Sequence, residues 1–310
     1  MSVYTELTHA DISAILADYN IGSLSSFEGI AAGIENSNFF IDTDQGTRYV
    51  LTIFERLEAD ELPYFMHLMK HLASNELACP DVMQRKDESL LFDLDGKQGC
   101  IVSCLSGRTL DQLNEAQLRS SGQAMAQLHL AGSDFSMRRN NPTGAEWLAE
   151  HIAAVLDKTE ERYGKGSAEL LSSELDFQSS CMFESLPKGV IHGDLFVDNI
   201  LFEGDQVSGI IDFYYAHDAA FAMDIAISLN AQAVLLCDAD DARIKAFMDA
   251  YQSVRPLEAE EVLALPLLLR LAALRFWVSR LYDAIFPRGG AMVQTKDPEE
   301  YRQKLQFHRK

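Results

Sequence analysis

The sequence predicts an α+β protein in two parts, a small strand-rich part at residues 1–104 and a larger, mostly helical part at residues 105–310. In the first part, short runs of alternating apolar and polar residues are separated by turn residues, a pattern that favours β-strands. Beyond Thr109, apolar residues recur at the helical period of about 3.6, apart from one hairpin-like segment. With 310 residues, the chain can bury a large core.

The first part is expected to begin with a helix. Thr8 and Asp11 can cap its start, Ile12 and Leu16 belong to its apolar stripe, and Gly22 follows its end. The elements expected after this helix are strands at 27–31, 38–43 and 48–54, a helix at 60–74, and a hairpin formed by 90–94 and 98–103.

The second part is expected to contain helices at 113–130 and 145–163, and its most hydrophobic stretch is 262–286. Three arginines interrupt that stretch, Arg270, Arg275 and Arg280. Because charged residues at the centre of a membrane span are costly, we expect a buried helix of a soluble domain there.

The most informative segment of the chain is His192-Gly193-Asp194-Leu195-Phe196-Val197-Asp198-Asn199. Asp194 and Asn199 are five residues apart, and Asp212 follows thirteen residues after Asn199. Strands expected at 199–202 and 207–211, joined by a turn, form a hairpin that directs these three side chains to one place.

This spacing is typical of phosphoryl-transfer sites. One carboxylate, here Asp194, orients the acceptor hydroxyl and takes its proton, while the amide of Asn199 and the carboxylate of Asp212 bind the Mg²⁺ that bridges the ATP phosphates. The alternative is an acidic loop beside an ordinary hairpin. His192 is expected to brace the loop by hydrogen bonding, and Asp198 is interpreted as a turn residue or a residue supporting the site.

With these motifs, the chain resembles the aminoglycoside phosphotransferase and choline kinase group, and within that group the kinase-fold homoserine kinases. The segments that carry the second resemblance are 49–55, 271–283, 287–288 and 296–298. The resemblance implies a protein-kinase-like fold of two lobes, ATP as co-substrate, and transfer to L-homoserine in threonine biosynthesis. Other acceptors of the same fold class, such as choline, an aminoglycoside or a protein serine, remain open.

Nucleotide binding is expected in the first part. The small residues Gly29, Ala31, Ala32 and Gly33 belong to the segment between the first two expected strands, where a loop can bring its N–H groups close to phosphate oxygens. The resemblance implies that adenine is bound by main-chain atoms, the Ser103 carbonyl and the Leu105 amide.

Thr52 is a departure from the kinase pattern, because it stands where the third strand normally carries a phosphate-binding lysine. A threonine hydroxyl can bind a phosphate by hydrogen bonding but carries no charge. Mg²⁺ with another cation, Arg48, Arg56 or Lys70, would compensate; otherwise the protein would be a binding-only pseudokinase. The retained Asp194, Asn199 and Asp212 favour activity.

An amino-acid alcohol as acceptor needs a cation for its carboxylate and an acidic or carbonyl group for its ammonium. The expected substrate-binding residues are Arg275, Trp277 and Arg280 on the late helix, together with Asp218. The arginines could instead form ion pairs within the helical part. Asp224 is interpreted as structural, and the aromatic residues after Asp212 keep a choline-type acceptor open.

Composition excludes several classes of protein. A formal net charge of −21 disfavours nucleic acid and anionic membranes as partners. The five cysteines show no metal-binding spacing and read as reduced thiols. With no basic and apolar leader at the N-terminus, a cytoplasmic protein is expected; the oligomeric state is not indicated.

Overall fold

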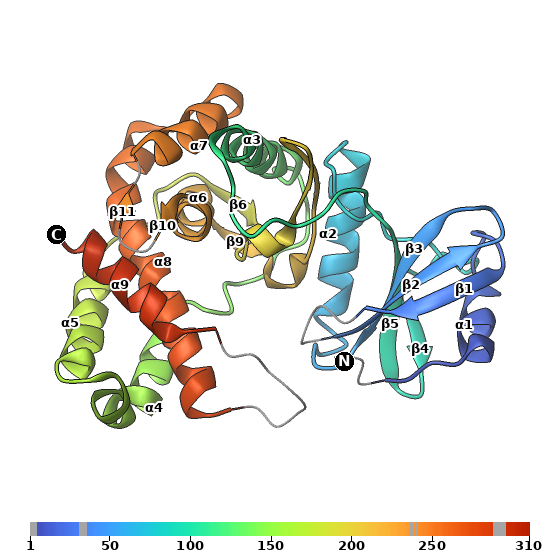
Figure 1. The fold of residues 1–310 in the computed structure, drawn as a ribbon, viewed down its shortest axis with the longest axis horizontal. Helices are drawn as coiled ribbons and strands as arrows, with labels where there is room; N and C mark the ends of the chain where they lie inside the picture. Colours follow the sequence, from blue (N-terminus) through green and yellow to red (C-terminus); the bar gives the residue numbers. More distant parts are fainter. Residues whose placement is uncertain (1–4, 31–35, 236–237, 240, 288–295) are drawn as a thin grey trace. The chain divides into compact units, whose positions relative to one another are not determined.

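The computed structural model describes residues 5–30, 36–235, 238–239, 241–287 and 296–310. The chain forms two compact units, each described here by itself (Figure 1). The first contains residues 1–107 and 208–211, and the second contains residues 108–207 and 212–310. Residues 208–211 belong to the first unit, although the sequence predicted all of 105–310 in the second part.

The first unit is built on a five-stranded antiparallel sheet with the strand order β1-β2-β3-β5-β4. Figure 1 shows α1 on one side of this sheet and α2 on the other. The elements are α1 (His9–Leu16), β1 (Leu24–Gly29), β2 (Asn36–Thr43), β3 (Arg48–Phe54), α2 (Leu62–Ser74), β4 (Phe92–Leu94) and β5 (Lys97–Ser103). The predicted order of strands and helices is confirmed, but the first helix ends at Leu16, well before Gly22; half of the other predicted ends coincide and the rest differ by one to three residues.

Local chemistry explains these elements. Thr8 caps α1, and its hydroxyl accepts a hydrogen bond from the Asp11 amide while the Asp11 carboxylate accepts one from the Thr8 amide. Ile12, from α1, packs with Ile41, Leu51 and Ile101, which lie on the buried face of the sheet. In the register of the sheet, Thr52 is paired with Asn38 on one side and with Cys100 on the other.

The second unit is mostly helical, as predicted, and includes small two-stranded pieces around the loop that contains Asp194. Its helices are α3 (Glu115–Ala131), α4 (Ala145–Tyr163), α5 (Ser167–Ser179), α6 (Phe221–Ser228), α7 (Asp241–Val254), α8 (Ala259–Ile285) and α9 (Pro298–His308). Its strands are β6 (Lys188–Ile191), β7 (Ile200–Glu203), β8 (Gln206–Ile210, whose end belongs to the first unit), β9 (His217–Ala220), β10 (Val234–Leu235) and β11 (Asp238–Ala239). Short helical turns occur at Val197–Asn199, Phe213–Tyr215 and, in π form, Leu229–Ala233.

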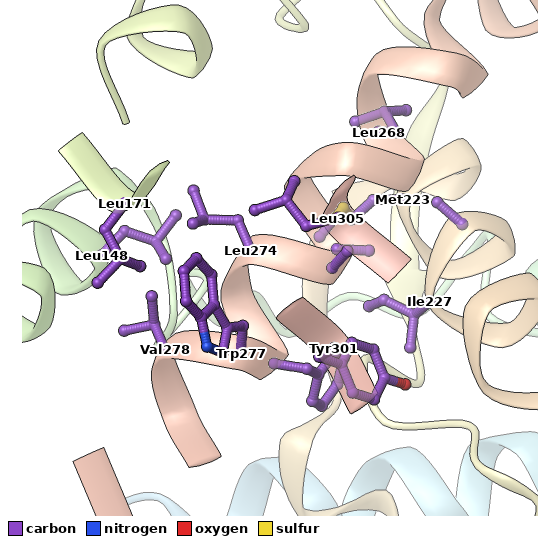
Figure 2. Close-up of a cluster of buried hydrophobic side chains, with 14 of the residues drawn as sticks. Leu148, Leu171, Met223, Ile227, Leu268, Leu274, Trp277, Val278, Tyr301 and Leu305 are labelled. Carbon is purple, nitrogen blue, oxygen red and sulfur yellow. The ribbon is translucent and has the colours of Figure 1, made fainter. Parts of the chain in front are cut away.

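The core of the second unit surrounds α8. Figure 2 shows Trp277 of α8 among Leu148 of α4, Leu171 of α5 and Val278, with Tyr301 and Leu305 of α9 beside them. Trp277 is 0% exposed. Burying an indole of this size removes a large apolar area from water, and α8 is therefore held from several sides.

Helix α8 is long and apolar enough to cross a membrane by length and composition, a property that the core helix of a soluble protein shares. Its three arginines bind groups of the same unit. Arg270 pairs with the buried Glu174 at 2.6 Å, Arg275 donates to the Gly193 carbonyl, and Arg280 pairs with Glu300 at 2.7 Å. These pairings agree with the expected helix of a folded domain.

Candidate active site

The site is built on the loop 192–199, which connects β6 to β7. Gly193 has a left-handed backbone, with φ of 76°, and a Cβ atom there would lie 2.9 Å from the Tyr215 carbonyl oxygen. Glycine is therefore the residue that this turn accepts. The imidazole of His192 is buried, and its Nδ1 accepts a hydrogen bond from the Asp194 amide at 3.3 Å, so the predicted bracing role is confirmed.

The N–H groups of the loop are held by Asp224, at the first turn of α6. Its carboxylate accepts hydrogen bonds from the His192 amide at 2.8 Å and the Gly193 amide at 2.9 Å. The carboxylate is fully buried and also bonds His129 Nε2 at 3.1 Å, while His129 Nδ1 bonds the Tyr251 hydroxyl. The structural role interpreted for Asp224 is confirmed.

The charge state of this network follows from its contacts. Burial acts to raise the pKa of Asp224, but hydrogen bonds from His129 and from the loop hold that pKa below its ordinary value. Burial lowers the pKa of His129. A carboxylate can only accept, so His129 Nε2 carries the proton and Nδ1 accepts from the Tyr251 hydroxyl. The loop is thus fixed by an ionised carboxylate and a neutral imidazole.

The carbonyl groups of the loop are held from three other directions. Arg275 of α8 donates to the Gly193 carbonyl at 2.7 Å. Gln232, in the π-helical turn, donates to the Leu195 carbonyl at 2.9 Å, and Ser228 donates to the same oxygen at 3.3 Å. The side-chain amide of Asn199 donates a hydrogen bond to the Asp194 carbonyl at 2.8 Å. These bonds satisfy buried backbone groups and leave the loop one conformation.

Asp194 itself is only partly exposed. Burial, opposed by Arg275 and reinforced by Asp212, raises the pKa of Asp194 to about 8. A raised pKa makes the ionised carboxylate a stronger base, toward which the proton of a hydroxyl can pass. Asn199 Nδ2 lies 3.4 Å from Asp194 Oδ2, which brings together two of the three predicted residues.

Asn199 and Asp212 supply oxygen donors suited to Mg²⁺. The Asp194 carbonyl can only accept, so the Asn199 atom facing it is the nitrogen, and Oδ1 is directed elsewhere. Asp212 has a left-handed backbone, with φ of 66°, directly after β8. Within the described ranges, no group of three or more His, Cys, Asp and Glu side chains could hold a metal alone.

In the first unit, the predicted nucleotide-binding residues differ in their burial and in their hydrogen-bond partners. Thr52 is 3% exposed, and its hydroxyl donates to Asn38 Oδ1 at 2.8 Å. Ser103 exchanges hydrogen bonds with Asp81: each backbone amide donates to an oxygen of the other residue at 2.9 Å. The Leu105 side chain fills the space beside Gly209, where a Cβ atom would lie 2.5 Å from Leu105 Cδ1.

The remaining nucleotide predictions concern the loop after β1. Gly29 is the last residue of that strand. Ala31, Ala32 and Gly33 lie outside the described residues. Two of the cations considered as substitutes for the missing lysine are already paired: Arg48 bonds Asp42 at 2.7 Å, and Lys70 bonds the Val82 carbonyl at 3.2 Å.

The structure separates the four predicted acceptor-binding residues. Arg275 lies against the loop and acts electrostatically on Asp194. Asp218 accepts a hydrogen bond from the Arg139 amide at 2.9 Å and pairs with Arg138. The other two, Trp277 and Arg280, contact the core around α8 and helix α9.

Trp277 packs in the core rather than at a substrate surface, because it lies on the side of α8 that faces α4 and α5 (Figure 2). Arg280 fastens α9, because it donates to the Asp297 carbonyl and to Glu300 and lies over the ring of Tyr301. Gln232 and Tyr301 also contact the loop, at the Leu195 carbonyl and the Phe196 ring, through long-range packing that no local sequence pattern reveals.

Comparison with known proteins gives relatives along the whole chain. Homoserine kinase of Methylobacillus flagellatus is 43% identical over 302 residues, covering 96% of this chain and 92% of the relative. Homoserine kinase of Methylobacterium nodulans is 45% identical over 317 residues, covering 100% and 97%. Homoserine kinase of Rhizobium etli strain CFN 42 is 42% identical over 318 residues, covering 100% and 96%.

Solved structures share the fold at low sequence identity. Amicoumacin kinase hAmiN, in complex with AMP-PNP, Ca²⁺ and Ami, superimposes with a TM-score of 0.71 at 13% identity, covering 96% of this chain and 91% of that one. Choline kinase from Cryptosporidium parvum superimposes with a TM-score of 0.63 at 16% identity, covering 97% and 94%. The predicted protein-kinase-like α+β fold is confirmed. The phosphotransferase enzyme family matches residues 26–263, and this chain belongs to it.

Proposed function

We propose that this protein is a homoserine kinase, which transfers the γ-phosphoryl group of ATP to the side-chain hydroxyl of L-homoserine. The observation that carries the proposal is the identity of 42–45% with homoserine kinases over nearly the whole chain, in a protein that keeps an ordered Asp194 loop. The products are O-phospho-L-homoserine and ADP, which places the enzyme in threonine biosynthesis and in the cytoplasm.

Asp194 acts on the acceptor hydroxyl. The hydroxyl oxygen attacks the γ-phosphorus, the bond to the oxygen that bridges the β- and γ-phosphates breaks, and the proton of the hydroxyl passes to the Asp194 carboxylate. Because hydrogen bonds to Asp224 and from Arg275 and Gln232 fix the loop, the carboxylate is already oriented before the acceptor arrives.

Asn199 Oδ1 and the Asp212 carboxylate would hold Mg²⁺, which supplies charge neutralisation to the ATP phosphates when bound. In the first unit, Gly29, Ala31, Ala32 and Gly33 would approach the phosphates, with the Thr52 hydroxyl as a neutral donor. The Ser103 carbonyl and the Leu105 amide would bind adenine. In this assignment, Mg²⁺ supplies the positive charge that a lysine on the third strand would otherwise bring to the phosphates.

For the acceptor, Arg275 is the proposed cation, because it bonds the loop and acts electrostatically on Asp194. Its bond to the Gly193 carbonyl fixes the guanidinium beside the loop, and the remaining donors of its planar fork suit a carboxylate. Asp218 is a candidate for the ammonium group. Arg280 and Trp277 are assigned to the packing of α8 and α9 instead.

An ADP-release assay with Mg²⁺-ATP and separate acceptors tests the proposal. L-Homoserine, choline, kanamycin and no acceptor are compared, and the Asp194→Asn variant serves as the matched control. We expect turnover with homoserine that far exceeds the others and is lost in the variant. Turnover with choline or kanamycin but not with homoserine would assign another acceptor. Binding of Mg²⁺-ATP without turnover on any acceptor would indicate a pseudokinase.

A further inference from the structure

Tyr301, on α9, has a polar group to which the described residues make no hydrogen bond. Its side chain is 0% exposed, and its hydroxyl has no hydrogen-bond partner among the residues that the structure describes. Leaving a buried hydroxyl unpaired costs free energy, so native proteins rarely tolerate one without a reason. In Figure 2 the hydroxyl oxygen points away from the Trp277 side of the core.

The ring of Tyr301 is fixed beside the catalytic loop. It packs against Phe196, two residues after Asp194, with a centroid distance of 6.2 Å. It also packs against Phe276, which follows Arg275, at 5.3 Å. The guanidinium of Arg280 and the ammonium of Lys304 lie over the same ring, at 4.5 and 4.7 Å. These contacts hold the hydroxyl in place without any hydrogen bond of its own.

The charged groups around the hydroxyl are the cations Arg275 and Arg280 and the carboxylates Asp194 and Glu300. Arg280 and Lys304 share one carboxylate, Glu300, and each also donates a hydrogen bond to a backbone carbonyl. Arg275 has instead a backbone carbonyl as its hydrogen-bond partner and is close enough to Tyr301 to act on it electrostatically. A phenol O–H next to a guanidinium offers two donors to one carboxylate.

We propose that the Tyr301 hydroxyl donates a hydrogen bond to the carboxylate of the amino-acid acceptor, beside Arg275, and so determines acceptor specificity. This inference rests on the proposed function. It accounts for the unpaired hydroxyl, whose partner is the substrate. It also gives α9 a role in acceptor binding, in addition to its packing on α8.

Access requires a small movement. Because the hydroxyl is buried, the acceptor has to displace a neighbouring side chain to reach it. Phe196 is the suitable one, because it is only partly buried, belongs to the loop that carries Asp194, and contacts Tyr301 directly. The ammonium of Lys296 lies 5.0 Å from the Phe196 ring centroid and pairs with the exposed Asp198 at 3.0 Å. This surface ion pair therefore holds Lys296 against Phe196, the side chain that covers Tyr301.

The test is Tyr301→Phe, which keeps the ring and removes one oxygen atom. We expect the KM for homoserine to rise by about tenfold or more, the loss expected for one hydrogen bond to a charged group, with the KM for ATP unchanged. The melting temperature should not fall, because the removed hydroxyl makes no hydrogen bond to the described residues. A homoserine KM within about twofold of the unmodified protein would overturn the proposal.

A matched control is Tyr19→Phe in the first unit. Tyr19 is also buried, at 3% exposed, and its hydroxyl has no hydrogen-bond partner among the described residues. The same atom is removed at a site with no role in acceptor binding, so both KM values should stay unchanged. An equal rise of the homoserine KM in both variants would mean that the effect is not specific to Tyr301, and would overturn the assignment.

Two homoserine analogues identify the group that is bound. Propanolamine lacks the carboxylate and γ-hydroxybutyrate lacks the ammonium, and each is measured as a competitive inhibitor against homoserine. Tyr301→Phe should weaken inhibition by γ-hydroxybutyrate and leave that by propanolamine unchanged. Equal weakening for both would contradict a carboxylate contact. Absence of homoserine turnover in the unmodified protein would instead overturn the proposed function, and this inference with it.

Discussion

Polar and charged side chains make different kinds of contact in the two units. In the first unit, Thr52 and Asn38 form a neutral pair within the sheet, and the cation Arg48 is bonded to Asp42 at the surface. In the second unit, buried and charged side chains, among them Asp224 and Arg275, bond the backbone of the catalytic loop directly. Exposed ion pairs contribute little to stability, whereas buried ones are costly to break.

This difference shows which backbone segment is held most firmly by side-chain hydrogen bonds. The loop around Asp194 has its N–H groups and carbonyl groups bonded from α6, α8 and the π-helical turn, so its conformation is determined by the fold of the second unit. In the first unit, Thr52 is buried in the sheet, and the ion pair of Arg48 with Asp42 lies at the surface. Substitutions in the loop network should therefore have larger effects than substitutions around Thr52.

The largest expected effect is on catalysis, in the variant Asp194→Asn. Loss of a general base reduces rates by roughly 10²- to 10⁴-fold, and kcat should fall within that range in an ADP-release assay. Thermal stability should be maintained or raised, because burial raises the pKa of Asp194 and the ionised form is disfavoured in the fold. A variant that keeps more than about a tenth of the activity would contradict the assigned role.

Next in size is the loss of Asp224, which should affect stability and activity together. Asp224→Ala leaves the His129 N–H and two loop N–H groups without an acceptor, so the free energy of unfolding should fall by about 3–5 kcal/mol. Urea denaturation measures this loss. Asp224→Asn, which keeps one acceptor oxygen, should be less affected; equal behaviour of the two variants would argue against the hydrogen bonds as the cause.

Acid should destabilise the second unit through two buried histidines. Burial lowers the pKa of His217 and the pKa of His308 to about 4 each. The unfolded chain protonates both near pH 6.5, so it binds more protons than the folded chain between about pH 6.5 and 4. Stability is therefore fully present above about pH 6.5 and falls as the pH is lowered, by up to about 1 kcal/mol per pH unit for each histidine.

His308→Gln isolates one of these contributions. His308 Nε2 lies 2.7 Å from Asn230 Oδ1, and a glutamine amide can donate the same bond without titrating. Chemical denaturation at a series of pH values should show a shallower decline between about pH 6.5 and 4 in the variant. An unchanged slope would show that His308 does not contribute to the acid sensitivity.

The smallest effect is expected in the first unit, for Thr52→Val. This change leaves Asn38 Oδ1 without its 2.8 Å donor, and because Asn38 is only partly buried the cost should be about 1 kcal/mol. Thr52→Ser keeps the hydroxyl and serves as control. If the hydroxyl also binds phosphate, the KM for ATP should rise in the valine variant only; an unchanged KM would limit Thr52 to packing.

The sequence predicted what depends on local pattern. Turn residues and alternation located the strands of the first unit, and the spacing of Asp194, Asn199 and Asp212 located the catalytic loop. Residues that act through long-range packing could not be found in this way. Gln232 reaches the Leu195 carbonyl only because a π-helical turn follows α6, and nothing in its neighbours marks it.

Helix α8 shows the same limit in another form. Its residues are apolar on most faces, so periodicity does not tell which side chains face the loop and which face the core. Arg275 and Trp277 are two positions apart and therefore point in different directions, one toward Gly193 and the other into the cluster with Leu148 and Leu171. Only the packing of α4, α5 and α9 around the helix separates them.

The central claim is that this fixed loop transfers phosphate to L-homoserine. The most direct test follows transfer of the terminal phosphate of labelled ATP and isolates the phosphorylated product from the unmodified protein and from Asp194→Asn. We predict O-phospho-L-homoserine in equal amount to ADP, and its loss in the variant. Formation of ADP without phosphohomoserine, or equal product from the variant, would contradict the account.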